Sequence, residues 1–385
     1  MKVIHTADWH IGKRLNEYNL IEDQADYFNN LISMVEQENA DALIIAGDLY
    51  DRAVPSTEAV ALLNDVFTKL IRTGVKVFVI AGNHDSKERL NFLSPLFEEN
   101  GLFLCAEIKK DIKKVTLTDE FGDVNFYLLP FLSPHEASKL YPEATIKTYD
   151  DAYKKVLEDT VKNLDKKARN ILVGHGVFSV SDDKKILKHS ESEITIGGSE
   201  MVDASFLKDF DYIALGHLHS SQAAGMEKMR YAGSILKYSK SEATQRKGVP
   251  LLTLGEKEDL KIELKKIKPL RDLRIIKGNF QSVSQPSDTL GLSNDDYIFV
   301  ELEEKEPIID AVSKLRAIYP NIMGVSYTAI KKSDSNIIKS EKIKDKTNIE
   351  LFADFYKYIT GEIPDDEQAA IVTKTIEELG KESDK

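Results

Sequence analysis

The sequence predicts an α/β fold, in which two facing mixed sheets carry helices on their outer faces as a four-layer α/β/β/α sandwich. Short apolar runs such as LIIAGD and VFVIAGNHD end at Gly and polar residues, as buried strands do. Segments near 20–38, 57–72 and 86–98 have apolar residues three and four positions apart, as in helices that cover a sheet. Closely spaced strand signals further along the chain indicate the second sheet.

These later strand signals begin at about residue 113, with KKVTL and VNFYLLPF, and a charged helix near 148–166 leads to the run ILVGHG. The runs MRYAGS, VPLLTLG and LKIELKKI follow, and we expect them to complete the second sheet. The stretch 178–200 is rich in Ser, Asp, Glu and Lys. It is either a loop that controls substrate entry or a plain connection, and we favour the connection.

Five predicted strands run directly into metal-binding side chains, in IHTADWH, LIIAGD, VFVIAGNHD, ILVGHG and YIALGHLH. Open α/β sheets bind ligands at the carboxyl ends of their strands, so we expect these side chains to share one edge. Because side chains alternate along an extended segment, the two His of GHLH can face the same pocket. The candidate metal ligands are Asp8, His10, Asp48, Asn83, His175, His217 and His219.

This set of oxygen and nitrogen ligands contains no thiolate, which suits Mn, Fe, Zn or Mg rather than a structural zinc site. Seven ligands are too many for one ion but fit two ions that share a bridging carboxylate, about 3.5–4 Å apart, as in phosphate-ester hydrolysis. Asp48 is the natural bridge because it is the only candidate ligand at its strand end and lies between the other carboxylate and the His-rich half of the set. Each motif alone is more often a turn than a ligand, and the five together reverse that expectation.

The order DWH, GDLYDR, GNHD, GHG and GHLH resembles that of the calcineurin-type metallophosphoesterases, whose general pattern is DxH, GD, GNH[DE], GH and GHxH. This resemblance spans roughly residues 1–235. The start HTADWHIGK, the segment GDLYDR and the extra C-terminal region are similar to the SbcD family, the nuclease subunits of bacterial SbcCD complexes. This second resemblance covers nearly the whole chain.

The resemblance implies a role for each site residue. It assigns one ion to Asp8, His10, Asp48 and His219. It assigns the other ion to Asp48, Asn83, His175 and His217. It leaves His84 free of metal, in contact with the scissile phosphate and as the proton donor to the leaving oxygen, a role that suits an imidazole. The expected cofactors are two Mn²⁺ ions, with Mg²⁺ or other divalent ions as alternatives.

One position differs from archaeal and eukaryotic relatives, which usually carry a His three residues beyond the Asp of GD. This chain has Asp51 followed by Arg52, as the bacterial branch does. A guanidinium can grip phosphate oxygens with two hydrogen bonds, so Arg52 is our candidate replacement. An ion pair of Arg52 with Asp51 or Asp85 is an equal alternative.

With 385 residues the chain has room for more than one domain, and its single cysteine rules out an intramolecular disulfide. It shows neither a signal pattern nor an apolar run of membrane-spanning length, so we expect a cytoplasmic protein without membrane contact. The net charge of −12 disfavours unaided binding to DNA. Binding to DNA then requires positive charge from the metals and from a partner or a dimer groove. A local basic stretch either adds to this charge or is only a solvated strand face and linker. That stretch contains Lys265, Lys266, Lys268, Arg271 and Arg274.

A break at Lys268 and Pro269 marks a domain boundary. We predict four parts: a nuclease domain over 1–267, a capping domain that recognises DNA over 268–333, a linker over 334–347 and a helical docking segment over 348–385. An apolar face in NIELFADFYKYITG either docks in a partner's groove or packs back onto the capping domain. The resemblance implies an SbcC-type coiled-coil ATPase as that partner, bound through 348–380. It also implies a homodimer of this chain and a heterotetramer with the ATPase.

The sequence and the resemblance together predict a Mn²⁺-dependent DNA phosphodiesterase, the catalytic subunit of an ATP-dependent complex in recombination, replication and repair. By resemblance it is a 3′–5′ double-strand exonuclease and a single-strand and hairpin endonuclease. One alternative is a phosphodiesterase for small molecules or cyclic nucleotides, which would use the same metals. The other is a metal-free scaffold that only presents its tail to a partner.

Overall fold

The computed structural model describes residues 1–92, 94–109, 111–180, 200–285 and 295–328, with short stretches of the tail at 351–353, 356, 363–365 and 368–373. Most of the polar stretch 178–200, the predicted linker and most of the docking segment lie outside these residues. Within the described part of the tail, 351–353 and 368–373 are helical. Among the described residues, no helix combines the length and apolar composition that a membrane crossing requires.

The first sheet has six strands in the order β16-β15-β1-β4-β5-β6. Its parallel strands are β1 (Lys2–Thr6), β4 (Ala42–Ala46), β5 (Lys76–Ile80) and β6 (Leu102–Cys105). β15 (Val249–Leu254) pairs antiparallel with β1, and β16 (Leu260–Lys265) pairs antiparallel with β15. The helices that follow its strands are α1 (Ile21–Glu38), α2 (Thr57–Thr73), α3 (Lys87–Asn91) and α4 (Ser94–Glu99).

The second sheet also has six strands, in the order β13-β14-β12-β9-β8-β7. They are β7 (Lys113–Asp119), β8 (Gly122–Leu129), β9 (Arg169–His175), β12 (Tyr212–Gly216), β13 (Gln222–Ala223) and β14 (Met229–Tyr231). Its helices are α5 (Pro134–Leu140) and α6 (Tyr149–Lys162). Short elements complete this part: β2 (Arg14–Leu15), β3 (Tyr18–Asn19), β10 (Val177–Ser179), β11 (Met201–Asp203) and two 3₁₀ turns, η1 (Ala204–Leu207) and η2 (Lys240–Glu242).

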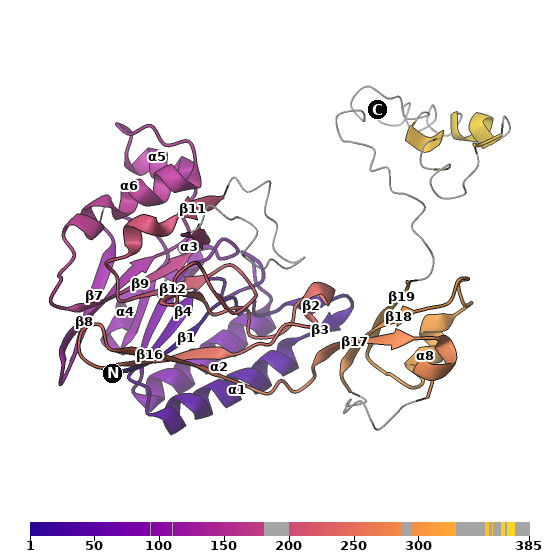
Figure 1. Cartoon of the computed structure of the whole chain (residues 1–385), viewed down its shortest axis with the longest axis horizontal. Helices are drawn as coiled ribbons and strands as arrows, with labels where there is room; N and C mark the ends of the chain where they lie inside the picture. The colour runs from indigo at the N-terminus through magenta and orange to yellow at the C-terminus, as the bar shows by residue number, and fades with distance from the viewer. Residues whose placement is uncertain are drawn as a thin grey trace.

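The two sheets face each other, with α1 and α2 on one outer side and α5 and α6 on the other (Figure 1). The core between the sheets contains Ile44 and Phe78 from the first sheet and Phe126 and Ile171 from the second. The rings of Phe78 and Phe126 stack with centroids 4.0 Å apart. The prediction of a four-layer α/β/β/α sandwich is confirmed.

Two details of the prediction were wrong. Strands β15 and β16, which we expected in the second sheet, extend the first sheet, and only β14 joins the second. β15 fits beside β1 because both its faces are apolar: Leu251 packs on the helix side and Leu252 in the core between the sheets. The helix expected near 86–98 is divided into α3 and α4, because Pro95 fits the first turn of a new helix but not the interior of a long one.

A smaller unit follows the sandwich, and we call residues 273–285 and 295–328 the C-terminal unit. Its parallel strands β17 (Leu273–Gly278), β18 (Tyr297–Leu302) and β19 (Ile322–Tyr327) pack with α7 (Phe280–Val283) and α8 (Ala311–Arg316) around a core of their own. The unit lies beside the β2–β3 hairpin (Figure 1), where Tyr18 donates to Pro320 O over 3.2 Å.

Candidate metal centre

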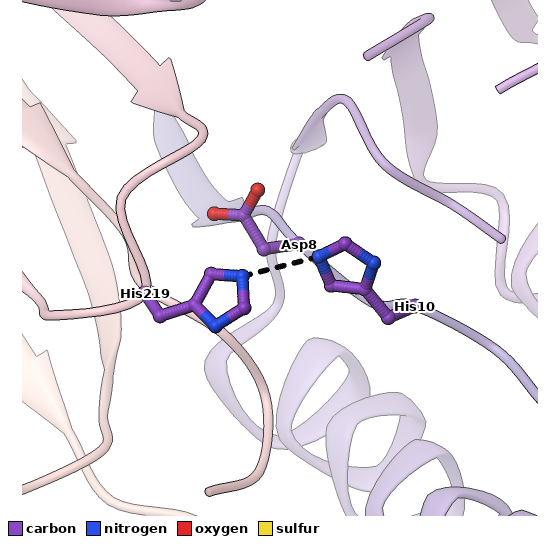
Figure 2. A group of neighbouring side chains, drawn as sticks. All are labelled: Asp8, His10 and His219. Atoms are coloured by element: carbon purple, nitrogen blue, oxygen red, sulfur yellow. Dashed lines mark hydrogen bonds between the residues drawn. The ribbon is translucent and has the colours of Figure 1, made fainter. Parts of the chain in front are cut away.

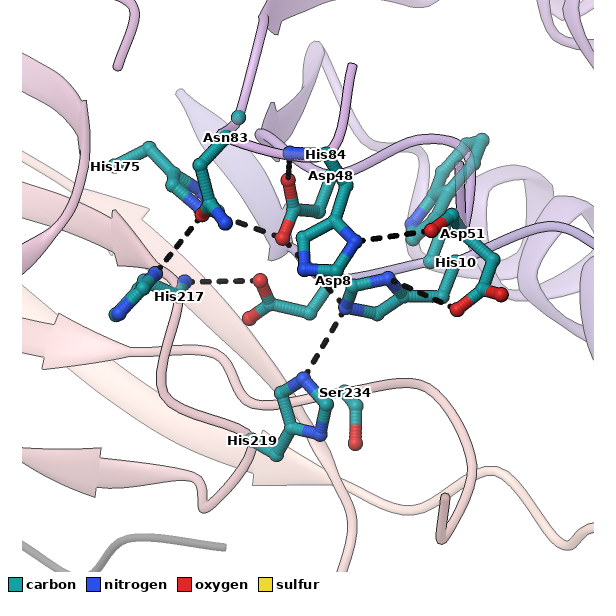
Figure 3. A network of polar contacts seen from close by, with 12 residues as sticks. Asp8, His10, Asp48, Asp51, Asn83, His84, His175, His217, His219 and Ser234 are labelled. Carbon is teal, nitrogen blue, oxygen red and sulfur yellow. Dashed lines mark hydrogen bonds and ion pairs between the residues drawn. The ribbon is translucent and has the colours of Figure 1, made fainter. Parts of the chain in front are cut away.

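All seven candidate ligands lie in the loops that follow β1, β4, β5, β9 and β12 or at the ends of these strands, where the carboxyl ends of both sheets meet (Figure 3). The close approach of the two sheets at this edge requires glycine at position 216. A Cβ atom on Gly216 would lie 1.9 Å from Ala46 O, so any side chain there would push the two sheets apart. The GH pair of the sequence motif therefore has a packing reason as well as a chemical one.

The first group of ligands contains Asp8, His10 and His219, whose candidate ligand atoms all lie within 4.8 Å of one another (Figure 2). The Nε2 atoms of His10 and His219 are 3.1 Å apart. Two imidazole nitrogens that bind one ion at about 2.1 Å each lie roughly 3 Å apart when their bonds meet near a right angle. The spacing of the two rings therefore suits one shared ion.

The second group forms around Asn83. Its Oδ1 lies 3.0 Å from His175 Nε2 and 3.1 Å from His217 Nδ1. The other ring nitrogen of His175, Nδ1, donates to Ala46 O over 2.8 Å, because a carbonyl oxygen can only accept. A neutral His175 therefore directs the lone pair of Nε2 at the lone pairs of Asn83 Oδ1. A proton on Nε2 would remove this repulsion by a hydrogen bond, and a cation between these atoms would remove it by ligation.

Asp48 lies between the two groups. Its Oδ2 is 3.6 Å from His10 Nε2 and 3.5 Å from His175 Nε2. Its Oδ1 accepts a hydrogen bond from the backbone N–H of His84 over 2.9 Å. One carboxylate oxygen is thus equally near to both groups, which is the geometry that a bridge between two ions requires.

The backbone at the site is strained. Asp8, His10, Asp48 and His217 have φ angles of 51°, 43°, 52° and 104°, in a region that side chains rarely adopt. Such conformations persist only where the surroundings hold them, and they cluster at functional sites. Part of this support is mutual, because His10 N donates to Asp48 O over 2.9 Å. Neither the motifs nor the strand prediction indicates this strain.

Burial and charge oppose each other at the site. Burial lowers the pKa of His217 to about 3. Burial also acts to lower the pKa of His175, but the Asp48 and Asp8 carboxylates and the hydrogen bond to Ala46 O together outweigh it and raise that pKa to about 9. Without metal, a proton on His175 therefore supplies positive charge that the buried carboxylates need. Metal binding must displace this proton, so metal affinity is linked to pH.

Two acidic side chains that are not candidate ligands support the ligands: Glu242, which no sequence motif indicates, and Asp85, the last residue of the GNHD motif. Glu242, fully buried, lies 3.2 Å from His219 Nδ1 and accepts from Lys247 Nζ over 2.6 Å. Asp85 accepts three backbone N–H groups, from Leu49, Tyr50 and Gly82, over 3.1, 3.1 and 2.9 Å. Burial and the charge of Asp48 raise the pKa of Asp85 to about 6. Glu242 fixes a ligand ring, and Asp85 joins the loops after β4 and β5.

Neither of the two predicted catalytic residues is buried, since His84 is half-buried and Arg52 is exposed. His84 Nδ1 donates to Asp51 O over 2.9 Å, which leaves Nε2 as its other reactive atom. The His84 ring also lies close to His10 and Asp48, so distance alone does not separate it from the ligands. Arg52 is 79% exposed, and its Nε lies 3.6 Å from Asp51 Oδ2. Of the two partners considered for Arg52, the structure therefore shows Asp51, while Asp85 binds backbone amides.

The basic stretch before and within β17 is largely neutralised. Lys265 pairs with Glu38 over 2.8 Å, and Arg274 pairs with Asp296 over 2.7 Å. Arg271 pairs with the acidic residues at the start of α1. Three of the five cations thus have acidic partners, which supports the alternative of a solvated strand face and linker for them.

Two family models match the chain. The model described as calcineurin-like phosphoesterase matches residues 1–221, and the one described as type 5 capsule protein repressor C-terminal domain matches residues 269–360. The chain is also 36% identical over 362 residues to the SbcD component of the SbcCD nuclease of Staphylococcus epidermidis, a match that covers 94% of each chain.

Solved structures with similar folds are more distant. A dimetal phosphatase from Danio rerio is 12% identical, and the match covers 69% of this chain and 95% of that one with a TM-score of 0.42. The protein TT1561 of Thermus thermophilus is 13% identical, with 68% and 98% covered and a TM-score of 0.40. Likenesses this distant carry no argument about substrate or mechanism.

Proposed function

The chain belongs to the calcineurin-like phosphoesterase family and, within it, to the SbcD-type nuclease subunits, and on this premise we propose that it is a two-metal DNA nuclease that uses Mn²⁺. Membership makes it a phosphodiester hydrolase of the SbcCD type that depends on divalent metals. The observation that carries the proposal is the position of Asp48 Oδ2, equally near to His10 Nε2 and His175 Nε2.

In this proposal the first ion is held by Asp8, His10, His219 and Asp48. The second is held by Asp48, Asn83, His175 and His217. When bound, the ions supply the Lewis acidity that activates water near neutral pH and stabilises charge on a phosphodiester. The oxygen and nitrogen donors fit Mn²⁺, and the lack of thiolate among them argues against a structural Zn²⁺ site.

His84 is the proposed general acid. Its Nδ1–H is held by Asp51 O, so the ring is oriented and Nε2 is the atom that can carry a proton to the leaving sugar oxygen. Arg52 is the proposed phosphate-binding residue. Its exposed side chain has the freedom to reach a bound strand, and its weak pairing with Asp51 costs little to break.

For the substrate we propose DNA, cleaved as a 3′–5′ double-strand exonuclease and as a single-strand and hairpin endonuclease, in recombination, replication and repair. The relative's description as a component of SbcCD supports an SbcC-type ATPase as the partner, bound through residues 348–380. We keep the division into 1–267, 268–333, 334–347 and 348–385, with homodimer and heterotetramer, as parts of the same proposal. A cytoplasmic location is proposed with them.

The test is cleavage by the purified chain in Mn²⁺ of labelled linear duplex, hairpin DNA and bis-p-nitrophenyl phosphate, with chelator and Asp48→Ala as controls. Cleavage of DNA that both controls abolish is the expected result. Cleavage of the small diester alone, even with the partner ATPase added, would favour a small-molecule phosphodiesterase. Failure to bind Mn²⁺ at all would favour a scaffold.

A further inference from the structure

Gln24, fully buried in the first turn of α1, binds the loop that carries His10. Its Nε2 donates to His10 O over 2.8 Å and approaches Trp9 O at 3.2 Å, and its Oε1 accepts from Gly12 N over 3.0 Å. One side chain thus holds three backbone groups within four consecutive residues. Buried amides with this many partners fix local geometry, because any displacement leaves polar groups unpaired.

This loop needs such support. Asp8 and His10, both candidate ligands, adopt positive φ angles, and strain of this kind persists only where neighbours prevent its release. Tyr238 adds to the support: its hydroxyl donates to Trp9 O over 2.5 Å and accepts from Gln24 Nε2 over 3.0 Å. Its ring also lies edge-on against the His10 ring, with centroids 5.7 Å apart.

The preceding residue, Asp23, is equally buried but binds the C-terminal unit and the segment that leads to it. Its Oδ2 accepts from Tyr297 OH of β18 over 2.8 Å, and its Oδ1 accepts from Arg271 Nε over 3.1 Å. The Arg271 guanidinium lies 5.8 Å from the Tyr297 ring centroid. Two consecutive residues of one helical turn therefore bind the loop at His10 and the C-terminal unit.

We propose that Gln24 is a positioning residue for His10. We also propose that, through Asp23, the affinity for the first ion depends on the position of the C-terminal unit. The inference rests on the proposed function, because it takes Asp8, His10 and His219 as ligands of that ion. Asp23 and Gln24 share a rigid helical turn. A shift of the C-terminal unit that pulls on Asp23 therefore moves the amide that holds His10 in its strained conformation.

The first experiment is a calorimetric Mn²⁺ titration of the full chain with Gln24→Glu and Gln24→Met. Glu keeps the shape and the acceptor for Gly12 but places a carboxylate against two carbonyls, and Met removes every polar contact. Loss of such outer contacts weakens metal affinity by about 10–100-fold. We expect one of the two ions to bind about tenfold or more weakly and the other to keep its affinity. The cleavage rate should recover at high Mn²⁺, so that the metal requirement changes and the maximal rate does not.

The second experiment tests the link to the C-terminal unit. Tyr297→Phe removes only the hydroxyl that donates a hydrogen bond to Asp23, and we expect it to lower the affinity for the same ion by about threefold or more. Combined with Gln24→Glu, it should add little, because both changes act through one turn. The matched control is Asn125→Asp, a buried amide changed to a carboxylate in β8, whose partners Thr116 and Asn170 lie in the second sheet.

Each outcome decides a different point. Two tightly bound ions in both Gln24 variants would overturn the inference and leave the proposed function standing. An equal loss of affinity for both ions, or a similar loss of affinity in Asn125→Asp, would mean general destabilisation and would also overturn the inference. An unchanged Tyr297→Phe would remove the link to the C-terminal unit. Fewer than two ions in the wild-type chain would instead contradict the proposed function.

Discussion

The Nε2 atoms of His10 and His219 lie 3.1 Å apart, although the two residues are 209 positions apart in the sequence. His10 follows a strand of the first sheet, and His219 follows a strand of the second. Glu242 lies within hydrogen-bonding distance of Nδ1 of His219, an arrangement that favours a lone pair on Nε2. The two sheets thus bring together ligand atoms that only a shared proton or a shared cation can hold this close.

Single substitutions at this site should differ in the number of ions that they remove. His219→Ala should remove one ion, because its ring faces only the first group, whereas Asp48→Ala should remove both because its oxygen faces both groups. Metal content after dialysis against Mn²⁺, measured by mass spectrometry, checks this. Asp65→Ala, an exposed carboxylate on α2, is the matched control and should keep both ions. Retention of one ion in Asp48→Ala would refute the bridge.

His84→Gln should lower the rate of phosphodiester cleavage by about 100-fold or more, because it removes the proton donor. Metal content should stay at two ions, since Gln can still donate to Asp51 O and no ligand is lost. Rates at saturating Mn²⁺ and metal content must be measured on the same preparation, because His84 lies near His10 and Asp48. Loss of an ion would make His84 a ligand rather than an acid, and a near wild-type rate would exclude both roles.

Glu242→Gln should lower the affinity for one ion by about 10–100-fold, because the carboxylate orients His219 and raises the basicity of its ring. Burial acts to raise the pKa of Glu242, but His219 and Lys247 outweigh it and hold this pKa far below its usual value, so the lost group is a charge. Mn²⁺ titration checks the affinity, and Glu263→Gln, a partly exposed carboxylate on β16, is the control. An unchanged affinity would show that the position of His219 does not depend on Glu242.

The strand-end rule predicted the fold and the meeting of the seven side chains because both depend on local patterns. Apolar runs that end in Gly and a ligand are visible in the sequence, and parallel strands bring such ends together. The assignment of β15 failed because nothing local distinguishes a strand that returns to β1 from one that extends β14.

The residues that support the ligands could not be predicted from the sequence either, because no local pattern marks them. Glu242 lies in a polar stretch without periodicity, and its contact with His219 spans 23 positions. Gln24 belongs to an ordinary helical pattern, and only the packed structure reveals that its amide binds the loop at His10. Positive φ angles at Asp8 and Asp48 are likewise set by tertiary hydrogen bonds and not by residue type.

Removal of the residues after about 340 should leave basal cleavage of the small diester intact and abolish binding to the SbcC-type ATPase. The catalytic side chains all precede residue 220, so the tail has no direct part in the chemistry. Pull-down with the purified ATPase, combined with diester hydrolysis, checks both halves. Binding that survives the deletion would assign the docking surface to the folded units.

Far from the metal centre, Asp119 and Arg169 should control acid stability. Arg169 is buried at the start of β9 and donates to Asp119 over 3.0 Å and to Gly122 O and Gly255 O over 2.8 Å each, which ties strands of both sheets together. Asp119→Asn leaves this buried cation without its carboxylate and should cost about 3 kcal/mol of unfolding free energy at pH 7.

The pH dependence of that loss follows from the pKa of Asp119, which hydrogen bonds from Arg169 hold well below its usual value. A depressed pKa in the folded state gives stability that is present above the unfolded pKa of about 3.9 and is lost as the pH falls further. Urea denaturation with chelator should therefore show a gap between wild type and Asp119→Asn that is full at pH 7 and narrows below about pH 4. Asp123→Asn, an exposed neighbour on β8, should change stability by less than about 0.5 kcal/mol at either pH. A gap that stays constant down to about pH 3 would mean that packing, and not the charge of Asp119, is what Arg169 requires.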